Sequence, residues 1–295
     1  MKIGIDLGGS KIEAILLDTE GNARWRRRVV TPSGNYGAIL QAIAALVAQA
    51  EAIAQEACTV GIGTPGSASP ATGLIRNSNS TCLNGQALHA DLEALLERPL
   101  RIANDANCFA LSEAVDGAGQ GASVVFGVIL GTGVGGGVVV NAQVLNGLNA
   151  IAGEWGHNRL EVEGSREAPL CYCGRRSCVE TWLSGPALAA DHLWATKEEL
   201  KAPDIVSRAA AGDADCEATM QRYESRLARA LATVINILDP DIVVLGGGLS
   251  NAERLYANVP HRWQAHIFSD TVRTRLVPHM HGDSSGVRGA AWLWD

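Results

Sequence analysis

Two stretches decide how this chain is organised, GIDLGG at residues 4–9 and GVILGT at residues 127–132. Each is an apolar run that ends in a glycine turn, and a second apolar run follows directly. Each half also has a later strand that enters a second glycine loop, VGIGTPG at residues 60–66 and VVLGGG at residues 243–248. The repeat predicts an α/β protein of two duplicated domains that face each other across a cleft. The alternative is that glycine turns resemble one another by chance.

The composition indicates a folded protein with a small ligand. The chain has 295 residues, enough for two domains that each bury a core. Its net charge of −7 argues against a nucleic-acid partner, because Lys and Arg dominate such binding. The apolar runs are shorter than the ~20 residues of a membrane span, and the N-terminus does not look like a signal peptide. We therefore expect a cytoplasmic protein with no membrane partner.

Hydrophobic periodicity predicts the main elements. They are a three-stranded antiparallel meander over residues 2–30, helices at 36–57, 87–97, 106–115, 216–238 and 286–294, and strands at 59–62 and 100–103. The arginine-rich run at residues 24–28 has the charge of a phosphate or RNA patch. In an acidic protein it is better interpreted as an exposed sheet edge kept soluble by charge.

The first glycine turn carries groups that suit a nucleotide phosphate chain and its Mg²⁺. Asp6 would hold the water shell of the metal, and the backbone amides and polar side chains that follow would contact phosphate. These phosphate-contacting residues are Gly8, Gly9, Ser10 and Lys11. Because a lone glycine turn more often serves a tight hairpin, the matched second turn is what strengthens the interpretation.

Two glycine turns in the second half extend the predicted nucleotide site. Gly131, Thr132 and Gly133 offer a second set of backbone amides for phosphate, which would imply that the cleft closes. The other turn follows an apolar strand and lets the backbone approach a flat ligand such as adenine. It consists of Gly246, Gly247 and Gly248. The alternative for this turn is a simple connection between a strand and a helix.

Asn104 and Asp105 follow a short strand and begin a helix. One explanation is helix capping, which both residue types do well. The functional interpretation is that Asp105 accepts a proton from a substrate hydroxyl while Asn104 hydrogen-bonds the neighbouring hydroxyl. Phosphoryl transfer requires positioning more than base strength, so an ionised carboxylate would suffice.

The string CYCGRRSC at residues 171–178 places three cysteines within eight residues, and His157 lies upstream. Cys171, Cys173 and Cys178 suit a structural Zn²⁺, which takes four ligands in a tetrahedron. From spacing, His157, Cys216 and Cys108 all remain candidates for the fourth ligand. If His157 binds the metal through one ring nitrogen, the other becomes a donor that can reach a sugar hydroxyl.

Two glutamates belong to the same loop region. Glu154 precedes His157 by three residues, and Glu180 follows Cys178 by two. Carboxylates that accept from paired hydroxyls would select a polyol, whereas the ordinary fate of a glutamate is a solvated surface charge. We expect loss of the metal to weaken sugar binding and to spare nucleotide binding.

Taken together, these motifs resemble the ROK sugar kinases of the actin-like ATPase superfamily, which has a ribonuclease H-like fold. The motifs occur in that family's order along the whole chain: DLGGSK at 6–11, ANDAN at 103–107, GTG at 131–133, GEWGH at 153–157, the cysteine cluster and LGGG at 245–248. Many relatives have Thr where this chain has Ser10, and Gly where it has Ser177.

The resemblance implies the roles of the site residues. Asp105 would be the general base, with sugar contacts from Asn104, Glu154, His157 and Glu180, to which we add Gly66. His157 would complete the zinc site with the three cysteines. The C-terminal helix would pack on the first domain, which would then comprise residues 1–117 plus 283–295, with residues 118–282 forming the second.

Within the family, GEWGHN at 153–158, CYCG at 171–174 and the tail HGDSSGVRGAAWLW at 281–294 look most similar to fructokinases of the manno(fructo)kinase type. This implies ATP- and Mg²⁺-dependent phosphorylation of the fructose 6-hydroxyl, with mannose or glucose as further substrates, by a homodimer. A glucokinase or N-acetylhexosamine kinase is the alternative. A sugar-sensing ROK regulator is a further alternative, but we expect no helix-turn-helix before the first strand at Lys2.

Overall fold

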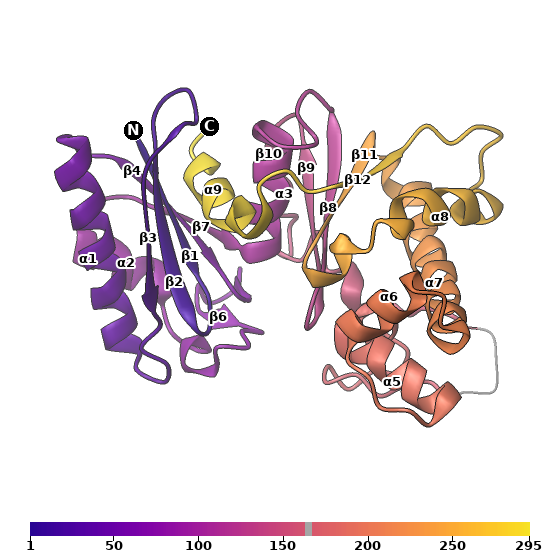
Figure 1. The fold of residues 1–295 in the computed structure, drawn as a ribbon. Coiled ribbons are helices and arrows are strands. Elements are labelled where there is room, and N and C mark those ends of the chain that lie inside the picture. The colour runs from indigo at the N-terminus through magenta and orange to yellow at the C-terminus, as the bar shows by residue number, and fades with distance from the viewer. Residues whose placement is uncertain (163–166) are drawn as a thin grey trace. The chain divides into compact units, whose positions relative to one another are not determined.

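The computed structural model describes residues 1–162 and 167–295, which form two compact units (Figure 1). The first comprises Met1–Gly121, Gly137–Ala152 and Met280–Asp295, and the second comprises Ala122–Gly136 and Gly153–His279. The first unit therefore includes residues 137–152, which the sequence placed in the second domain. The chain also returns to it at Met280, slightly before the expected residue 283.

The first unit is built on a sheet with the order β3-β2-β1-β4-β7. β1 (Lys2–Leu7), β2 (Lys11–Leu17) and β3 (Ala23–Val30) are antiparallel neighbours, which confirms the predicted meander. β4 (Thr59–Thr64) pairs in parallel with β1, and β7 (Arg101–Asn104) pairs in parallel with β4. The carboxyl ends of these three strands consequently lie at one edge of the sheet, where ligands commonly bind in α/β folds.

β3 is the outer strand of this sheet, as the arginine-rich run predicted, and its arginines also have a specific partner. Glu13 on the adjacent β2 is fully buried, and its carboxylate forms ion pairs with Arg26 and Arg28. A buried carboxylate without a partner would be costly, so these two arginines allow an acidic residue inside the sheet.

Helix α1 (Tyr36–Ala54) buries one apolar face in the core of the first unit, through residues that include Ile39, Ile43 and Leu46. Among the described residues, α1 is long and apolar enough to cross a membrane. Length and composition alone are weak evidence for a membrane span, because a core helix of a soluble protein meets the same two criteria. Its buried apolar face explains its composition.

Helices α3 (Asp105–Val115) and α9 (Ser285–Trp292) pack unusually closely in the first unit. A Cβ atom on Gly289 of α9 would lie 1.7 Å from the carbonyl oxygen of Cys108 on α3. A Cβ on Gly61 of β4 would lie 1.8 Å from the carbonyl oxygen of Ala290. The two glycines let α9 contact both the sheet and the helix that begins at Asp105.

The second sheet repeats the topology of the first. Its order is β10-β9-β8-β11-β12, and β8 (Val124–Leu130), β11 (Ile242–Gly246) and β12 (Arg275–Pro278) are parallel neighbours. β9 (Val134–Val140) and β10 (Gln143–Val144) complete it. The equivalent strand order in both sheets confirms the duplication that the glycine turns predicted.

Helices account for most of the remaining second unit. α4 (Glu180–Leu183), α5 (Gly185–Thr196), α6 (Ala202–Ala210), α7 (Ala214–Leu238) and α8 (Arg254–Trp263) are its α-helices as described. α7 matches the predicted long helix, and α5, α6 and α8 lie in a half of the chain that the sequence predicts to be otherwise helical without giving their bounds. The first unit also has α2 (Leu88–Leu96) and the hairpin of β5 (Ser67–Ala68) and β6 (Ile75–Arg76).

Candidate functional site

The first unit brings two predicted carboxylates together at the edge where β1 and β7 end. Asp6 is the penultimate residue of β1, and Asp105 begins α3 directly after β7. Burial is the main reason that the pKa of Asp6 rises to about 6, and the negative charges of Asp105 and Glu13 raise it further. A carboxylate in this setting gains from a nearby cation, so the edge is suited to a hydrated Mg²⁺.

Asn104 both caps α3 and positions the neighbouring loop. Its side-chain oxygen accepts from the backbone N–H of Ala106 at 2.9 Å, and its Nδ2 donates to the carbonyl oxygen of Gly66 at 3.0 Å. Gly66 has a φ of 79°, and a Cβ there would lie 2.4 Å from the carbonyl oxygen of Arg76. The structure therefore places Asn104, Asp105 and Gly66 at one corner, and the capping and binding interpretations of Asn104 are compatible.

The first glycine turn is held by backbone contacts that leave its tip exposed. The N–H of Gly8 donates to the carbonyl oxygen of Lys11 at 3.0 Å, and the Thr31 hydroxyl donates to the carbonyl oxygen of Gly8 at 2.7 Å. Gly9 and Ser10 are exposed and line a cavity of about 400 Å³. The carbonyl oxygens of Gly9 and Ser10 accept from the Ser33 hydroxyl and the Thr31 N–H, so the turn is held in one shape while its exposed tip stays accessible to a phosphate chain.

The second unit joins the other two glycine turns in one cavity of about 770 Å³. Gly131 and Thr132 line it from one side of the sheet edge, and Gly248 and Leu249 line it from the turn after β11. Gly247 has a φ of 81°, a backbone conformation that glycine adopts without strain. The cavity wall is largely apolar, which suits a nucleobase.

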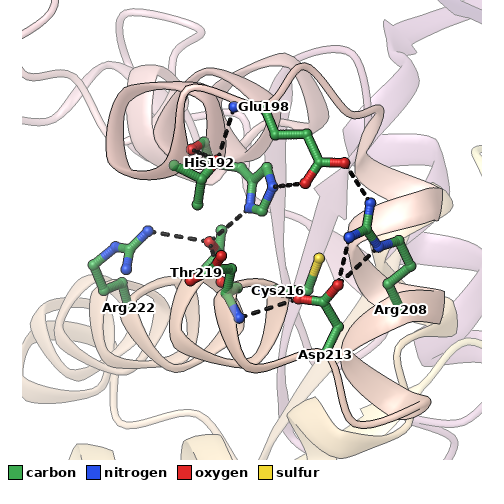
Figure 2. A network of polar contacts seen from close by, with 9 residues as sticks. His192, Glu198, Arg208, Asp213, Cys216, Thr219 and Arg222 are labelled. Atoms are coloured by element: carbon green, nitrogen blue, oxygen red, sulfur yellow. Dashed lines mark hydrogen bonds and ion pairs between the residues drawn. The ribbon is translucent and has the colours of Figure 1, made fainter.

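Helix α6 supplies another wall of this cavity, and its bounds were not predicted from the sequence. Figure 2 shows a polar network that anchors α6 to its neighbours. Arg208 on α6 pairs with Glu198 at 2.6 Å and with Asp213 at 2.5 Å. Glu198 lies 3.9 Å from the buried His192 ring of α5, which bonds Thr219 of α7 at 3.0 Å. The cavity wall is thereby fixed to both flanking helices.

The structure gathers His157, Cys171, Cys173 and Cys178 into one cluster, with their ligand atoms all within 4.8 Å of one another. His157 Nδ1 lies 3.6 Å from Cys171 Sγ, and Cys173 Sγ lies 3.6 Å from Cys178 Sγ. A tetrahedral site with Zn–S bonds of about 2.3 Å has ligand atoms roughly 3.8 Å apart, so the cluster fits Zn²⁺.

Among the described residues, the group that could hold a metal includes His157 and neither of the other two candidates for the fourth ligand. Cys216 lies in the first turn of α7, and Cys108 lies on α3. His157 is the residue that lies with Cys171, Cys173 and Cys178 in the cluster. A hydrogen bond from the backbone N–H of Arg175 is the main reason that the pKa of Cys173 falls to about 6. That thiol is therefore ionised near neutral pH, as metal binding requires.

Ser177 lies beside Cys178 in an uncommon backbone conformation. Its φ is 61°, in the left-handed region that favours glycine. The buried Ser177 hydroxyl donates to the carbonyl oxygen of Leu160 at 2.5 Å and accepts from Trp182 Nε1 at 3.0 Å. These two hydrogen bonds offset the backbone strain next to Cys178.

Glu180 links the metal loop to the second glycine turn, a contact that sequence reasoning missed. Its Oε2 accepts from the backbone N–H of Val134 at 2.9 Å, and a Cβ on Gly133 would lie 2.6 Å from the same oxygen. Glu154 is exposed at the start of the short turn that carries His157. Glu154 and His157 thus belong to one short turn, whereas Glu180 is the first residue of α4.

Tyr172 is a second residue that the sequence did not single out. Its hydroxyl lies 2.9 Å from His157 Nε2, and the two rings meet edge to face with their centroids 5.2 Å apart. A tyrosine between two cysteines gives no periodic signal, so its role depended on the folded loop.

Comparison with known proteins connects these features to one family. A model of the ROK family matches residues 2–295. The chain is 42% identical to an N-acetyl-D-glucosamine kinase from Erwinia tasmaniensis, over 99% of each chain. A crystal structure of a ROK hexokinase from Thermus thermophilus superposes with a TM-score of 0.88 at 30% identity and covers 99% of this chain and 97% of that one.

A further solved structure is relevant to ligands. A ROK family glucokinase from Streptomyces griseus, in complex with glucose and AMPPNP, superposes with a TM-score of 0.76 at 27% identity. The match covers 98% of this chain and 97% of that one. The expected similarity to fructokinases is not supported, because the curated relatives found at about 40% identity are N-acetyl-D-glucosamine kinases.

Proposed function

Because this chain belongs to the ROK family, we propose that it is an ATP-dependent sugar kinase that transfers the γ-phosphoryl group to a sugar hydroxyl. The observation that carries the proposal is the pairing of Asp6 with Asp105 at the edge of the first sheet. One carboxylate is placed for a metal and the other for a hydroxyl. Phosphoryl transfer needs both at once.

Each carboxylate has a distinct part in the proposed reaction. Asp105, fixed at the first turn of α3 beside Asn104, accepts the proton of the attacking hydroxyl. Asn104 and Gly66 hold the adjacent part of the sugar. Asp6 binds the hydrated Mg²⁺ of the nucleotide, and Mg²⁺ supplies charge neutralisation at the phosphates.

The glycine turns bind the nucleotide in this proposal. In the first unit we assign phosphate contacts to Gly8, Gly9, Ser10 and Lys11, and in the second unit we assign them to Gly131, Thr132 and Gly133. The apolar cavity beside Gly246 to Gly248 accepts the adenine base. The N–H of Gly131 donates to the carbonyl oxygen of Gly133 at 3.0 Å, so the turn is closed by its own hydrogen bond, and the lack of side chains at both positions lets an anion approach the backbone.

The metal cluster supports the sugar side of the site. We assign Zn²⁺ to His157, Cys171, Cys173 and Cys178, where it fixes the loop that carries Glu154 and Glu180. These glutamates accept hydrogen bonds from sugar hydroxyls. The metal is structural, since all four of its positions are filled by protein ligands.

N-acetyl-D-glucosamine is the sugar that we favour, with phosphorylation at the 6-hydroxyl. The relatives at 40–42% identity over almost the whole chain carry this activity in their names. This replaces fructose, the substrate that the motif resemblance implied. We also propose a cytoplasmic homodimer, in keeping with the expectation from the sequence.

A substrate panel tests the proposal. The purified protein is assayed with Mg²⁺-ATP by coupled detection of ADP, using N-acetyl-D-glucosamine, N-acetyl-D-mannosamine, glucose, mannose and fructose. We expect the highest kcat/KM with N-acetyl-D-glucosamine and a 6-phosphate product by NMR. A clear preference for fructose would restore the first assignment. Sugar binding without turnover for every sugar would instead favour the regulator.

A further inference from the structure

The exposed ring of Tyr172 belongs to none of the roles assigned above. Tyr172 is 80% exposed, whereas Trp155 and Trp182, the aromatic residues on either side of the metal cluster, are 4% and 2% exposed. It therefore contributes little to the core. Yet its hydroxyl has a specific partner, His157 Nε2 at 2.9 Å.

The cluster geometry decides which proton His157 carries. Nδ1 faces Cys171 Sγ at 3.6 Å, so Nδ1 is the nitrogen on the metal side of the ring. A metal on Nδ1 leaves Nε2 protonated, and Nε2 then donates its hydrogen bond. The Tyr172 oxygen accepts that bond, which leaves the phenol proton free to point away from the histidine.

The backbone on both sides of Tyr172 is fixed. Cys171 and Cys173 are both members of the metal cluster, and the N–H of Cys171 donates to the carbonyl oxygen of Arg175 at 2.7 Å. A side chain on such a backbone loses little further freedom when it binds a ligand, which favours its use as a contact.

Building on the proposed sugar kinase activity, we propose that Tyr172 is a sugar-contacting specificity residue whose hydroxyl, oriented by His157 Nε2–H, donates a hydrogen bond to a sugar oxygen. His157 then acts through Tyr172, because its own Nε2–H is already engaged. The metal cluster orients the His157 ring, the His157 ring orients the Tyr172 hydroxyl, and the hydroxyl contacts the sugar. The sugar contact that we expected of His157 is therefore made by Tyr172.

Tyr172→Phe tests the hydroxyl with the ring retained. We expect the Kd for N-acetyl-D-glucosamine, measured by calorimetry without nucleotide, and the KM for the sugar to rise about 5- to 10-fold, the effect of one neutral hydrogen bond. We expect kcat and the KM for ATP to stay within about 2-fold, and zinc to stay at about one per chain by elemental analysis. Tyr36→Phe is the matched control, because it removes a phenol hydroxyl bonded to Asp91 in the helix layer of the first unit.

Deoxy sugars identify the partner oxygen. The analogue that lacks the hydroxyl contacted by Tyr172 should bind the wild type and Tyr172→Phe equally, whereas the other deoxy analogues should retain the difference. If every analogue retains the difference, the contact is to the acetamido oxygen, and glucose should then bind both proteins equally.

The opposite outcomes overturn the proposal without ambiguity. An unchanged or lower sugar Kd in Tyr172→Phe, with zinc retained, would mean that the phenol blocks His157 instead of contacting sugar. Loss of zinc in Tyr172→Phe would show a purely structural role. The sugar kinase proposal fails separately, by absence of phosphorylation in the wild type with any sugar of the panel.

Discussion

The two sheets share one strand order, but the turns after their first strands carry different chemistry. In the aligned repeat, Asp6 of the first unit corresponds to Ile129 of the second, and Gly9 corresponds to Thr132. The first unit pairs carboxylates at its sheet edge, whereas the second has an apolar cavity and a metal cluster. A duplicated backbone can therefore divide a reaction, because each copy keeps the turn geometry while single side chains change the chemistry.

The largest expected effect comes from removing the base in the first unit. Asp105→Asn keeps the size and capping capacity of the side chain but cannot accept a proton, so we expect kcat to fall by about 10³-fold or more. Sugar affinity by calorimetry should change little. A kcat close to that of the wild type would show that Asp105 is not the general base. The first unit would then not differ from the second by supplying the base.

The packing of α9 should be the next most sensitive feature. In Gly289→Ala the new methyl group meets backbone atoms of α3, with Cys108 O only 1.7 Å away, so neither side can yield cheaply. We expect a loss of about 3 kcal/mol or more in unfolding free energy, measured by urea denaturation. Gly131→Ala is the matched change in the second unit, because nothing lies within 4 Å of a Cβ there.

The two glycine variants separate folding from binding. Gly131→Ala should leave the unfolding free energy within about 0.5 kcal/mol and raise the KM for ATP, because the methyl group obstructs the predicted phosphate contact. Equal destabilisation by both changes would show that the contact geometry of α9 does not control stability.

Loss of the metal tests how far the second unit acts as one site. Cys173→Ser should abolish zinc binding, lower the Tm by several degrees and raise the sugar KM at least about 10-fold. The Glu180 bond to Val134 ties this loop to the second glycine turn, so the KM for ATP should also rise severalfold. This revises the expectation that nucleotide binding is spared.

Cys216→Ser is the control for that experiment. It makes the same substitution at a fully buried thiol of α7 outside the cluster, so it should lower stability without changing zinc content. An unchanged KM for ATP in zinc-free Cys173→Ser would show that Glu180 holds its position without the metal.

The last comparison depends on pH and concerns the stability cost of Asp6 in the first unit. Burial raises the pKa of this carboxyl from 3.8 to about 6, so its ionised form is disfavoured in the folded protein. The cost is absent below pH 3.8, develops as the pH rises, and reaches about 3 kcal/mol above pH 6.

Asp6→Asn should therefore raise the Tm of the ligand-free protein at pH 7.5 and lose this advantage by pH 4. The same variant should lose Mg²⁺-ATP-dependent activity, because the proposed site for hydrated Mg²⁺ is gone. A Tm difference that does not depend on pH would show that Asp6 is not strained by its surroundings.

Much of the fold was predictable because its signals are local. The meander of residues 2–30, the helix at α7 and the repeated turns follow from apolar periodicity and glycine positions within short windows. Helices α5, α6 and α8 received no bounds from the sequence because they are short, 9 to 12 residues each, although Leu255, Val259 and Trp263 of α8 are buried at helical spacing. Asp6 lies near Asp105, and Gly131 lies near Gly248, because the members of each pair lie at the ends of parallel strands of one sheet.

What the sequence by itself determined is the duplicated α/β chain, the three closely spaced cysteines and the carboxylates at the ends of β1 and β7. Each depends on residue type and spacing over a few positions. The tertiary structure decided that His157 lies with the three cysteines and that Glu180 accepts a hydrogen bond from the Val134 N–H. It also decided that the Tyr172 hydroxyl lies beside His157 Nε2 and that α9 packs against α3 at Gly289. These facts are distances between side chains and backbone of separate segments, and chain folding, not spacing, sets such distances.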